Sequence, residues 1–405
     1  MSRRNSNRSG GFFTSFASAL IGAIVGGFVV YFLLAGARNN KIEDKSVENS
    51  EAKKEISQTI NIKDDESMES VVVKKSIDSV VGINTVSKVV QQSFFGPQSG
   101  YVEGIGSGSI VSEDGYIVTN SHVVSDGDVK EINVLFSNGE TAKADLVWND
   151  PSLDLAVIKV DKNGLKAIDI GDSDKVEVGD RAVAIGNPLG FQLQSTVTSG
   201  IISGLNRTVA FNTGVQMDGL MQTDAAINSG NSGGALLNSK GELIGINTAK
   251  AGNSDGIGFA IPINTVKPVI EKIRKNGKFD SVYLGITGQS LSYLKQLSYV
   301  NTDDLKDKDG IYVVSVFAEG QDIQEGDVIT AIDGKKVTDM SGLRKILLNY
   351  SIGDKVKISL IRDGEEEEID FTFSLDSSKM DEFKMAKPNN NEENRKRMNP
   401  FFNLP

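Results

Sequence analysis

The sequence predicts a mainly β protein with two folded modules and a membrane-spanning helix before them. Its 405 residues correspond to two or three domains at roughly 150 residues each. From about residue 71 onward, short β-branched runs alternate with Gly, Asn and Asp, which is typical of an antiparallel barrel or sandwich. The third observation is an uncharged apolar run near the N-terminus that is long enough to cross a bilayer.

The N-terminal run predicts the topology of the chain. Residues 16–35 are almost wholly apolar, and about 20 helical residues rise about 30 Å, which matches the hydrocarbon core. Three arginines precede the run, so we expect a cytoplasmic segment at 1–11, a single transmembrane anchor at 12–37 and an extracytoplasmic remainder. The alternative is a signal peptide cleaved after Ala35-Gly36-Ala37, but the apolar stretch exceeds the usual core of about 7–15 residues.

Composition divides the remainder into modules and connecting segments. Residues 38–70 and 377–405 are polar and charged, so we expect a disordered tether and a disordered tail. The first module should span 71–276, with strands near 108–111, 116–119, 132–136, 155–160, 182–185 and 243–246 and an amphipathic helix at 266–274. The second module should span 280–376, with strands at 311–316, 327–332, 355–361 and 368–373 and a helix at 340–348.

Residue counts exclude several classes of function. The net charge of −11 argues against a nucleic-acid-binding face. The absence of cysteine excludes a disulfide framework, a zinc ribbon, an iron–sulfur site and a thiol nucleophile. His122 is the only histidine, so any imidazole base in this protein must be His122. No metal or organic cofactor is implied.

The pentapeptide Gly230-Asn-Ser-Gly-Gly234 is the most informative chemical signal. Three glycines around Ser232 favour a tight turn that exposes the side chain and aims backbone N–H groups in one direction, as acyl transfer requires. An ordinary Gly-Ser loop is the alternative. His122 follows a strand-like run, and Asp154 stands directly before an apolar strand. The chain order His, Asp, Ser is that of the chymotrypsin architecture.

With these motifs, the sequence resembles the HtrA/Deg-type serine proteases, which carry a trypsin-like double β-barrel followed by a PDZ domain. The resemblance covers about residues 71–375, and its most specific stretch is Thr223-Asp-Ala-Ala-Ile-Asn-Ser-Gly-Asn-Ser-Gly-Gly-Ala-Leu236. Other matching stretches lie at 104–111, 119–124, 154–159, 184–190, 245–248 and 256–262.

The resemblance implies a catalytic triad. Ser232 would be the nucleophile, His122 its base and later the acid for the leaving amine, and Asp154 the group that orients and stabilises the imidazole. The backbone N–H groups of Gly230 and Ser232 would form the oxyanion hole.

Two further sites follow from the resemblance. Ala226 and Ile227 would line the specificity pocket, and their apolar character favours small or medium apolar substrate residues, which unfolding exposes. Asp224 is interpreted as a structural acid rather than a specificity acid. In the second module, Tyr283, Leu284, Gly285 and Ile286 would form a loop that receives the terminal carboxylate of a peptide, which then adds to the sheet edge as a strand.

These features favour an ATP-independent endopeptidase of the cell envelope that degrades misfolded or unfolded proteins through an acyl-enzyme. Two alternatives remain: a chaperone or holdase for unfolded chains, and a site-specific signalling protease activated through its PDZ domain. Family members are commonly trimers, so we expect a membrane-tethered homotrimer with no nucleic-acid partner.

Overall fold

The computed structural model describes residues 66–93, 96–187, 196–210, 216–228, 230–250, 256–297, 308–317, 322–377 and 379. The expected cytoplasmic segment 1–11, the anchor 12–37 and nearly all of the tether 38–70 and tail 377–405 lie outside them. Within the described part of the chain, no helix is long and apolar enough to cross a membrane.

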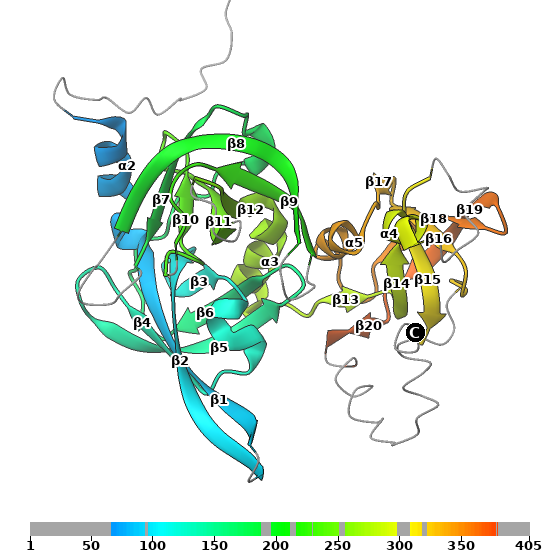
Figure 1. Ribbon diagram of the computed structural model, residues 1–405, viewed down its shortest axis with the longest axis horizontal. Helices are drawn as coiled ribbons and strands as arrows, with labels where there is room; N and C mark the ends of the chain where they lie inside the picture. The colour runs from blue at the N-terminus through cyan, green and yellow to red at the C-terminus, as the bar shows by residue number, and fades with distance from the viewer. Residues whose placement is uncertain are drawn as a thin grey trace, which may run out of the picture. The chain divides into compact units, whose positions relative to one another are not determined.

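The first six strands close into an antiparallel barrel in the order β1-β2-β3-β6-β5-β4 (Figure 1). Aliphatic side chains fill its interior, among them Ile83, Ile117 and Ile158, which are at most 1% exposed. A long hairpin of β1 and β2 extends beyond the barrel (Figure 1). The strands are β1 (Val80–Ser93), β2 (Gly96–Ile110), β3 (Tyr116–Thr119), β4 (Glu131–Leu135), β5 (Thr141–Asp150) and β6 (Leu155–Val160).

The next six strands close into a second barrel in the order β10-β11-β12-β9-β8-β7. Small and aliphatic side chains fill it, including Ala184, Ile202 and Leu236, all fully buried. The strands are β7 (Arg181–Gly186), β8 (Thr196–Ala210), β9 (Gln216–Thr223), β10 (Ala235–Leu237), β11 (Leu243–Lys250) and β12 (Gly258–Pro262).

Two helices pack on the barrels. α2 (Met68–Ser76) begins at Ser67, whose hydroxyl accepts the N–H of Ser70, and it buries Val72. α3 (Ile263–Asn276) buries aliphatic residues at helical spacing and ends at Gly277, which takes the left-handed conformation at φ 76°. Short 3₁₀ segments span Ile77–Ser79 (η1), His122–Gly127 (η2) and Ser173–Lys175 (η3).

The second module is built on a sheet in the order β14-β15-β16-β18-β19, with β17 paired to β16. Its core is separate and aliphatic, and Arg362 holds the buried Asp327 through two hydrogen bonds of 2.8 and 2.9 Å. The elements are β13 (Val282–Tyr283), β14 (Ile286–Ser290), α4 (Leu291–Leu297), β15 (Ile311–Val316), β16 (Val328–Ile332), β17 (Lys335–Lys336), α5 (Met340–Leu347), β18 (Lys355–Arg362), β19 (Glu365–Thr372) and β20 (Leu375–Asp376).

The mainly β class with two barrels and a following small domain is confirmed. The strands expected at 116–119, 155–160 and 311–316 have the expected bounds. The other expected strands and both expected helices are present with shifted ends: some extend beyond the apolar run, as α3 does, and others stop one residue short of it, as β4 and α5 do. Helices α2 and α4 were not expected, and α2 takes in the last three residues of the segment 38–70 that composition had assigned to the tether.

Candidate active site

His122 is placed by the end of β3 and the turn that follows it. Thr119 closes the strand, two fully buried residues come next, and His122 opens η2. The first of the buried residues, Asn120, donates its side-chain N–H to the main-chain oxygen of Asp154 at 2.9 Å. One side-chain amide therefore ties the segment that carries the histidine to the loop that carries the aspartate.

Asp154 ends the loop between β5 and β6 with an unusual backbone conformation. Its φ is 52°, in the left-handed region that Asp and Asn tolerate better than most residues. The preceding turn is closed by hydrogen bonds from Leu153 N to Asp150 O and from Asp154 N to Pro151 O. This conformation turns the carboxylate back toward the first residue of η2.

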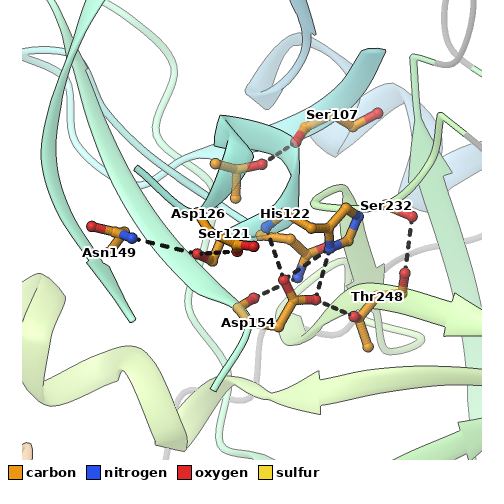
Figure 2. A network of polar contacts seen from close by, with 10 residues as sticks. Ser107, Ser121, His122, Asp126, Asn149, Asp154, Ser232 and Thr248 are labelled. Carbon is orange, nitrogen blue, oxygen red and sulfur yellow. Dashed lines mark hydrogen bonds and ion pairs between the residues drawn. The ribbon is translucent and has the colours of Figure 1, made fainter. Parts of the chain in front are cut away.

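The carboxylate of Asp154 accepts several hydrogen bonds from His122 and Thr248 (Figure 2). Nδ1 of His122 lies 2.8 Å from Oδ1 and 3.0 Å from Oδ2, and the backbone N–H of His122 donates to Oδ1 at 3.1 Å. The Thr248 hydroxyl donates to Oδ2. An ionised carboxylate has no proton to give, so Nδ1 carries the hydrogen and Nε2 is left free to accept one.

The surroundings of His122 raise its pKa. Burial alone favours the neutral ring, but the hydrogen bond to Asp154 and the negative charges of Asp154 and Asp126 outweigh it, so the pKa lies above its usual value of 6.5. Asp126 is held in turn by the Ser121 hydroxyl at 2.9 Å. The imidazolium is therefore stabilised by two carboxylates.

Ser232 lies in a tight turn between β9 and β10 whose glycines are sterically required. Gly230 and Gly233 have φ of 101° and 80°. A Cβ on Gly233 would lie 2.2 Å from the carbonyl oxygen of Ser107 and 2.3 Å from the Thr119 hydroxyl. The side chain of Asn231 braces the turn by accepting the N–H of Asn228 at 3.0 Å.

The Ser232 hydroxyl donates to the main-chain oxygen of Thr248 at 2.9 Å (Figure 2). Among the hydrogen bonds of the described residues, none joins Ser232 to His122, so the serine rests beside the imidazole rather than bonded to it. Catalytic hydrogen bonds often tighten only when substrate binds. Among the described residues, neither the N–H of Gly230 nor that of Ser232 has a hydrogen-bond acceptor.

Thr248 is a site residue that the sequence analysis did not assign. The pairing of β11 with β12 shifts register between Asn247 and Ala249, so Thr248 sits at an irregularity that re-aims its side chain. Its hydroxyl reaches Asp154 and its carbonyl reaches Ser232. The sequence signal was present, because Thr248 ends one of the stretches that match the HtrA pattern.

The expected specificity residues lie just before the serine turn. The main-chain oxygen of Ala226 accepts from Thr198 and Asn231, and Ile227 is buried against Gly258, where a Cβ would come within 2.4 Å of it. The Asp224 carboxylate accepts the backbone N–H of Ile201 at 2.6 Å and so braces β8.

The expected carboxylate loop connects β13 to β14. Gly285 takes a left-handed φ of 75°, and its carbonyl accepts the N–H of Phe317 at 2.8 Å. The Arg344 guanidinium, on α5, lies over the Tyr283 ring at 4.5 Å and donates to the main-chain oxygen of Val282. Arg344 also forms a buried ion pair with Asp150, which lies four residues before Asp154.

Comparison with known proteins identifies the family. The model of the trypsin-like peptidase domain matches residues 106–246, and that of the PDZ domain matches 282–372. The chain is 35% identical over 384 residues to the serine protease Do-like HtrA of Lactobacillus helveticus, covering 86% of this chain and 91% of that protein. It belongs to the HtrA family of serine proteases.

This HtrA-family chain is a serine endopeptidase with a trypsin-like double barrel and one PDZ domain. It is 39% identical over 284 residues to a probable periplasmic serine endoprotease, DegP-like, of Rickettsia prowazekii. The alignment covers 68% of this chain but only 54% of that relative. A solved structure of the HtrA-type protease AlgW with a decapeptide matches with a TM-score of 0.57 at 33% identity, covering 75% of this chain and 97% of that one.

Proposed function

We propose that this HtrA-family endopeptidase degrades unfolded or misfolded proteins without ATP, using Ser232, His122 and Asp154 as a catalytic triad. The observation that carries the proposal is the His122–Asp154 pair, which fixes the tautomer with a free Nε2 beside Ser232. The relatives, a Do-like serine protease and a probable DegP-like endoprotease, support the same activity.

The geometry supports acyl-enzyme hydrolysis. The Ser232 hydroxyl turns from the Thr248 carbonyl toward His122, gives its proton to Nε2 and attacks the substrate carbonyl. The N–H groups of Gly230 and Ser232 receive the oxyanion, and His122 then protonates the leaving amine. His122 next takes a proton from water, which attacks the acyl-enzyme, and then returns that proton to Ser232 as the carboxylic acid product leaves. Asp154 stabilises each imidazolium that forms.

Casein turnover by the full chain tests this mechanism. Ser232→Ala should reduce turnover by at least about 10³-fold, because the nucleophile is lost while binding surfaces remain. A fluorophosphonate should label the wild type at Ser232 and leave the variant unlabelled. Equal turnover by both proteins would eliminate the serine mechanism. A holdase would instead suppress aggregation of an unfolded client equally well in both and turn over neither.

The substrate preference follows from the segment before the serine. Ala226 carries no charge that would attract a cationic side chain, and Ile227 is apolar. Cleavage should therefore follow residues such as Val, Ala or Leu, which folded proteins bury. Mapping the new termini in a digest of one substrate, native and denatured, would show sites mainly in the denatured sample; equal cutting of both would contradict selection for unfolded chains.

The PDZ domain is proposed to bind the C-terminal ends of peptides. Tyr283, Leu284, Gly285 and Ile286 would receive the carboxylate, and β14 stands at the edge of its sheet, where a peptide can add as a strand. The AlgW structure with a decapeptide supports peptide recognition in this family. Fluorescence polarisation with a labelled peptide should show binding that is lost when its C-terminus is amidated.

A second candidate is a protease whose activity responds to the PDZ ligand. Arg344 touches both the carboxylate loop, at Val282 and Tyr283, and the catalytic Asp loop, at Asp150. Asp150→Asn would keep the oxygen that Ser152 uses and remove the charge opposite Arg344. The variant should bind peptide with wild-type affinity, but added peptide should change its cleavage rate by a different factor than it changes that of the wild type. An equal factor in both proteins would exclude this route.

Location and assembly are proposed from the sequence and the relatives. The apolar segment 12–37 would anchor the chain with its N-terminus in the cytoplasm, and the periplasmic location in the name of the Rickettsia relative supports an extracytoplasmic protease. A homotrimer is the proposed assembly. Resistance to alkaline extraction would test the membrane anchor. Analytical ultracentrifugation in detergent would test the homotrimer.

A further inference from the structure

Ser107, near the end of β2, uses all of its polar groups in contacts that surround the serine turn. It is fully buried in the first barrel. Its hydroxyl donates to the carbonyl of Gly230 at 2.6 Å and accepts the backbone N–H of Asn187 at 2.7 Å. Its own backbone N–H donates to the carbonyl of Ser232 at 2.8 Å, and its carbonyl accepts the Thr119 hydroxyl at 2.6 Å.

The two carbonyls that Ser107 holds belong to Gly230 and Ser232, the residues whose N–H groups form the proposed oxyanion hole. Gly230 and Ser232 flank Asn231, so Ser107 forms hydrogen bonds to the turn on both sides of Asn231. Fixing the Gly230 carbonyl fixes the peptide plane between the two donors. This constraint matters at Gly230, because a glycine at φ 101° has no side chain to limit its rotation.

The backbone of the second barrel approaches Ser107 closely. A Cβ on Gly186 would lie 3.1 Å from the Ser107 hydroxyl, and a Cβ on Gly233 would lie 2.2 Å from the Ser107 carbonyl oxygen. Two glycines thus allow the second barrel to approach this one residue closely. The contact with Thr119 extends the connection to the strand that leads to His122.

We propose that Ser107 is the positioning residue of the oxyanion hole: it holds the carbonyls of Gly230 and Ser232 and thereby aims their N–H groups at the developing negative charge. Preorganised donors cost no reorganisation at the moment of reaction, which is why they stabilise a transition state better than mobile ones. The inference rests on the proposed catalytic role of Ser232 and adds a residue from the first barrel to it.

The test compares Ser107→Ala with a matched control, Ser109→Ala, in the full chain. Ser109 lies two residues along the same strand, is also fully buried, and its hydroxyl has no hydrogen-bond partner among the described residues. A fluorogenic peptide with valine at the cleaved position gives kcat and KM. A trifluoromethyl ketone of the same peptide gives an inhibition constant that depends on the oxyanion it forms with Ser232.

Ser107→Ala should lower kcat by about 10- to 100-fold, somewhat less than loss of a donor itself, and leave KM within about 3-fold. The affinity for the ketone should fall by a similar factor, and Ser109→Ala should match the wild type in both. An unchanged ketone affinity, a loss confined to KM, or an equal loss in Ser109→Ala would overturn the proposal. Failure of the triad itself would appear differently, as full activity in Ser232→Ala.

Ser107→Cys keeps the test informative if the alanine variant does not fold. A thiol is a weaker hydrogen-bond donor of similar size, and the chain has no other cysteine with which it could pair. Its kcat and its affinity for the ketone should both fall between those of the wild type and the range expected for Ser107→Ala. Wild-type values for both would count against the proposal.

Discussion

Gly233→Ala should destabilise the protease domain more than an equivalent change at a glycine with free space. A left-handed conformation costs a residue with a Cβ about 1–2 kcal/mol. At Gly233 the new Cβ would also lie 2.2 Å from the main-chain oxygen of Ser107, well inside contact distance, so strand β2 or the serine turn must move. Overpacking of this kind costs about 1–3 kcal/mol more, giving a total of about 2–5 kcal/mol.

Gly139→Ala is the matched control, because Gly139 has nearly the same φ, 83° against 80°, and nothing within 4 Å of a Cβ. It should cost only the conformational part, about 1–2 kcal/mol. Urea unfolding followed by the fluorescence of Trp148, the single tryptophan, reports on the protease domain. Equal losses of unfolding free energy in the two variants would refute the steric argument.

Three further outcomes concern the carboxylate and the imidazole. Thr248→Val removes the hydroxyl that donates to Asp154, and kcat/KM should fall by about 10- to 100-fold, since hydrogen bonds to charged groups contribute about 1.5–3 kcal/mol; unchanged kinetics would contradict this. The kcat/KM of the wild type should rise with pH through the raised pKa of His122, with a midpoint above 6.5. Asp126→Asn removes one of the charges that raise this pKa, so the acid limb should move to lower pH, and an unmoved limb would argue against that contribution.

The pH dependence of stability has the opposite sign to that of activity. The folded state raises the pKa of His122 above its ordinary value of 6.5, so the charged pair with Asp154 stabilises the fold fully below pH 6.5. That contribution is lost as pH rises through the raised folded-state pKa. Over this window the enzyme gains activity while its imidazole contributes less to stability.

The sequence predicted the parts of the fold that apolar periodicity and glycine pattern determine. The run at 155–160 is apolar and buried at all positions but one, and the run at 311–316 is rich in β-branched residues and buries Ile311 and Val313, so both read clearly as strands. Helix α2 could not be found this way, because its three consecutive valines at 71–73 are typical of a strand, and Val72 is buried by packing against the barrel. Its stability depends on tertiary contact rather than on local pattern.

The candidate site likewise contains residues that the sequence identified and residues that it did not. His122, Asp154 and Ser232 have side chains whose chemistry is visible in the sequence, and the structure brings the first two into hydrogen bonding beside the third. Thr248 and Ser107 lie in stretches that match the HtrA pattern, but neither was assigned, because a hydroxyl amid β-strand residues does not reveal which groups it contacts. Their contribution depends on a register shift in β11 and on the close approach of two barrels, which only coordinates reveal.

The division of the proposed triad between two barrels has a consequence for biosynthesis. A chain made from its N-terminus completes the barrel of His122 and Asp154 before the residues around Ser232 exist, and the crossing bond from Ser107 can form only when both halves have closed. An enzyme that cleaves unfolded polypeptides therefore has no complete active site while its own chain is still unfolded. The order in which the two barrels are made therefore delays activity until synthesis has passed Ser232.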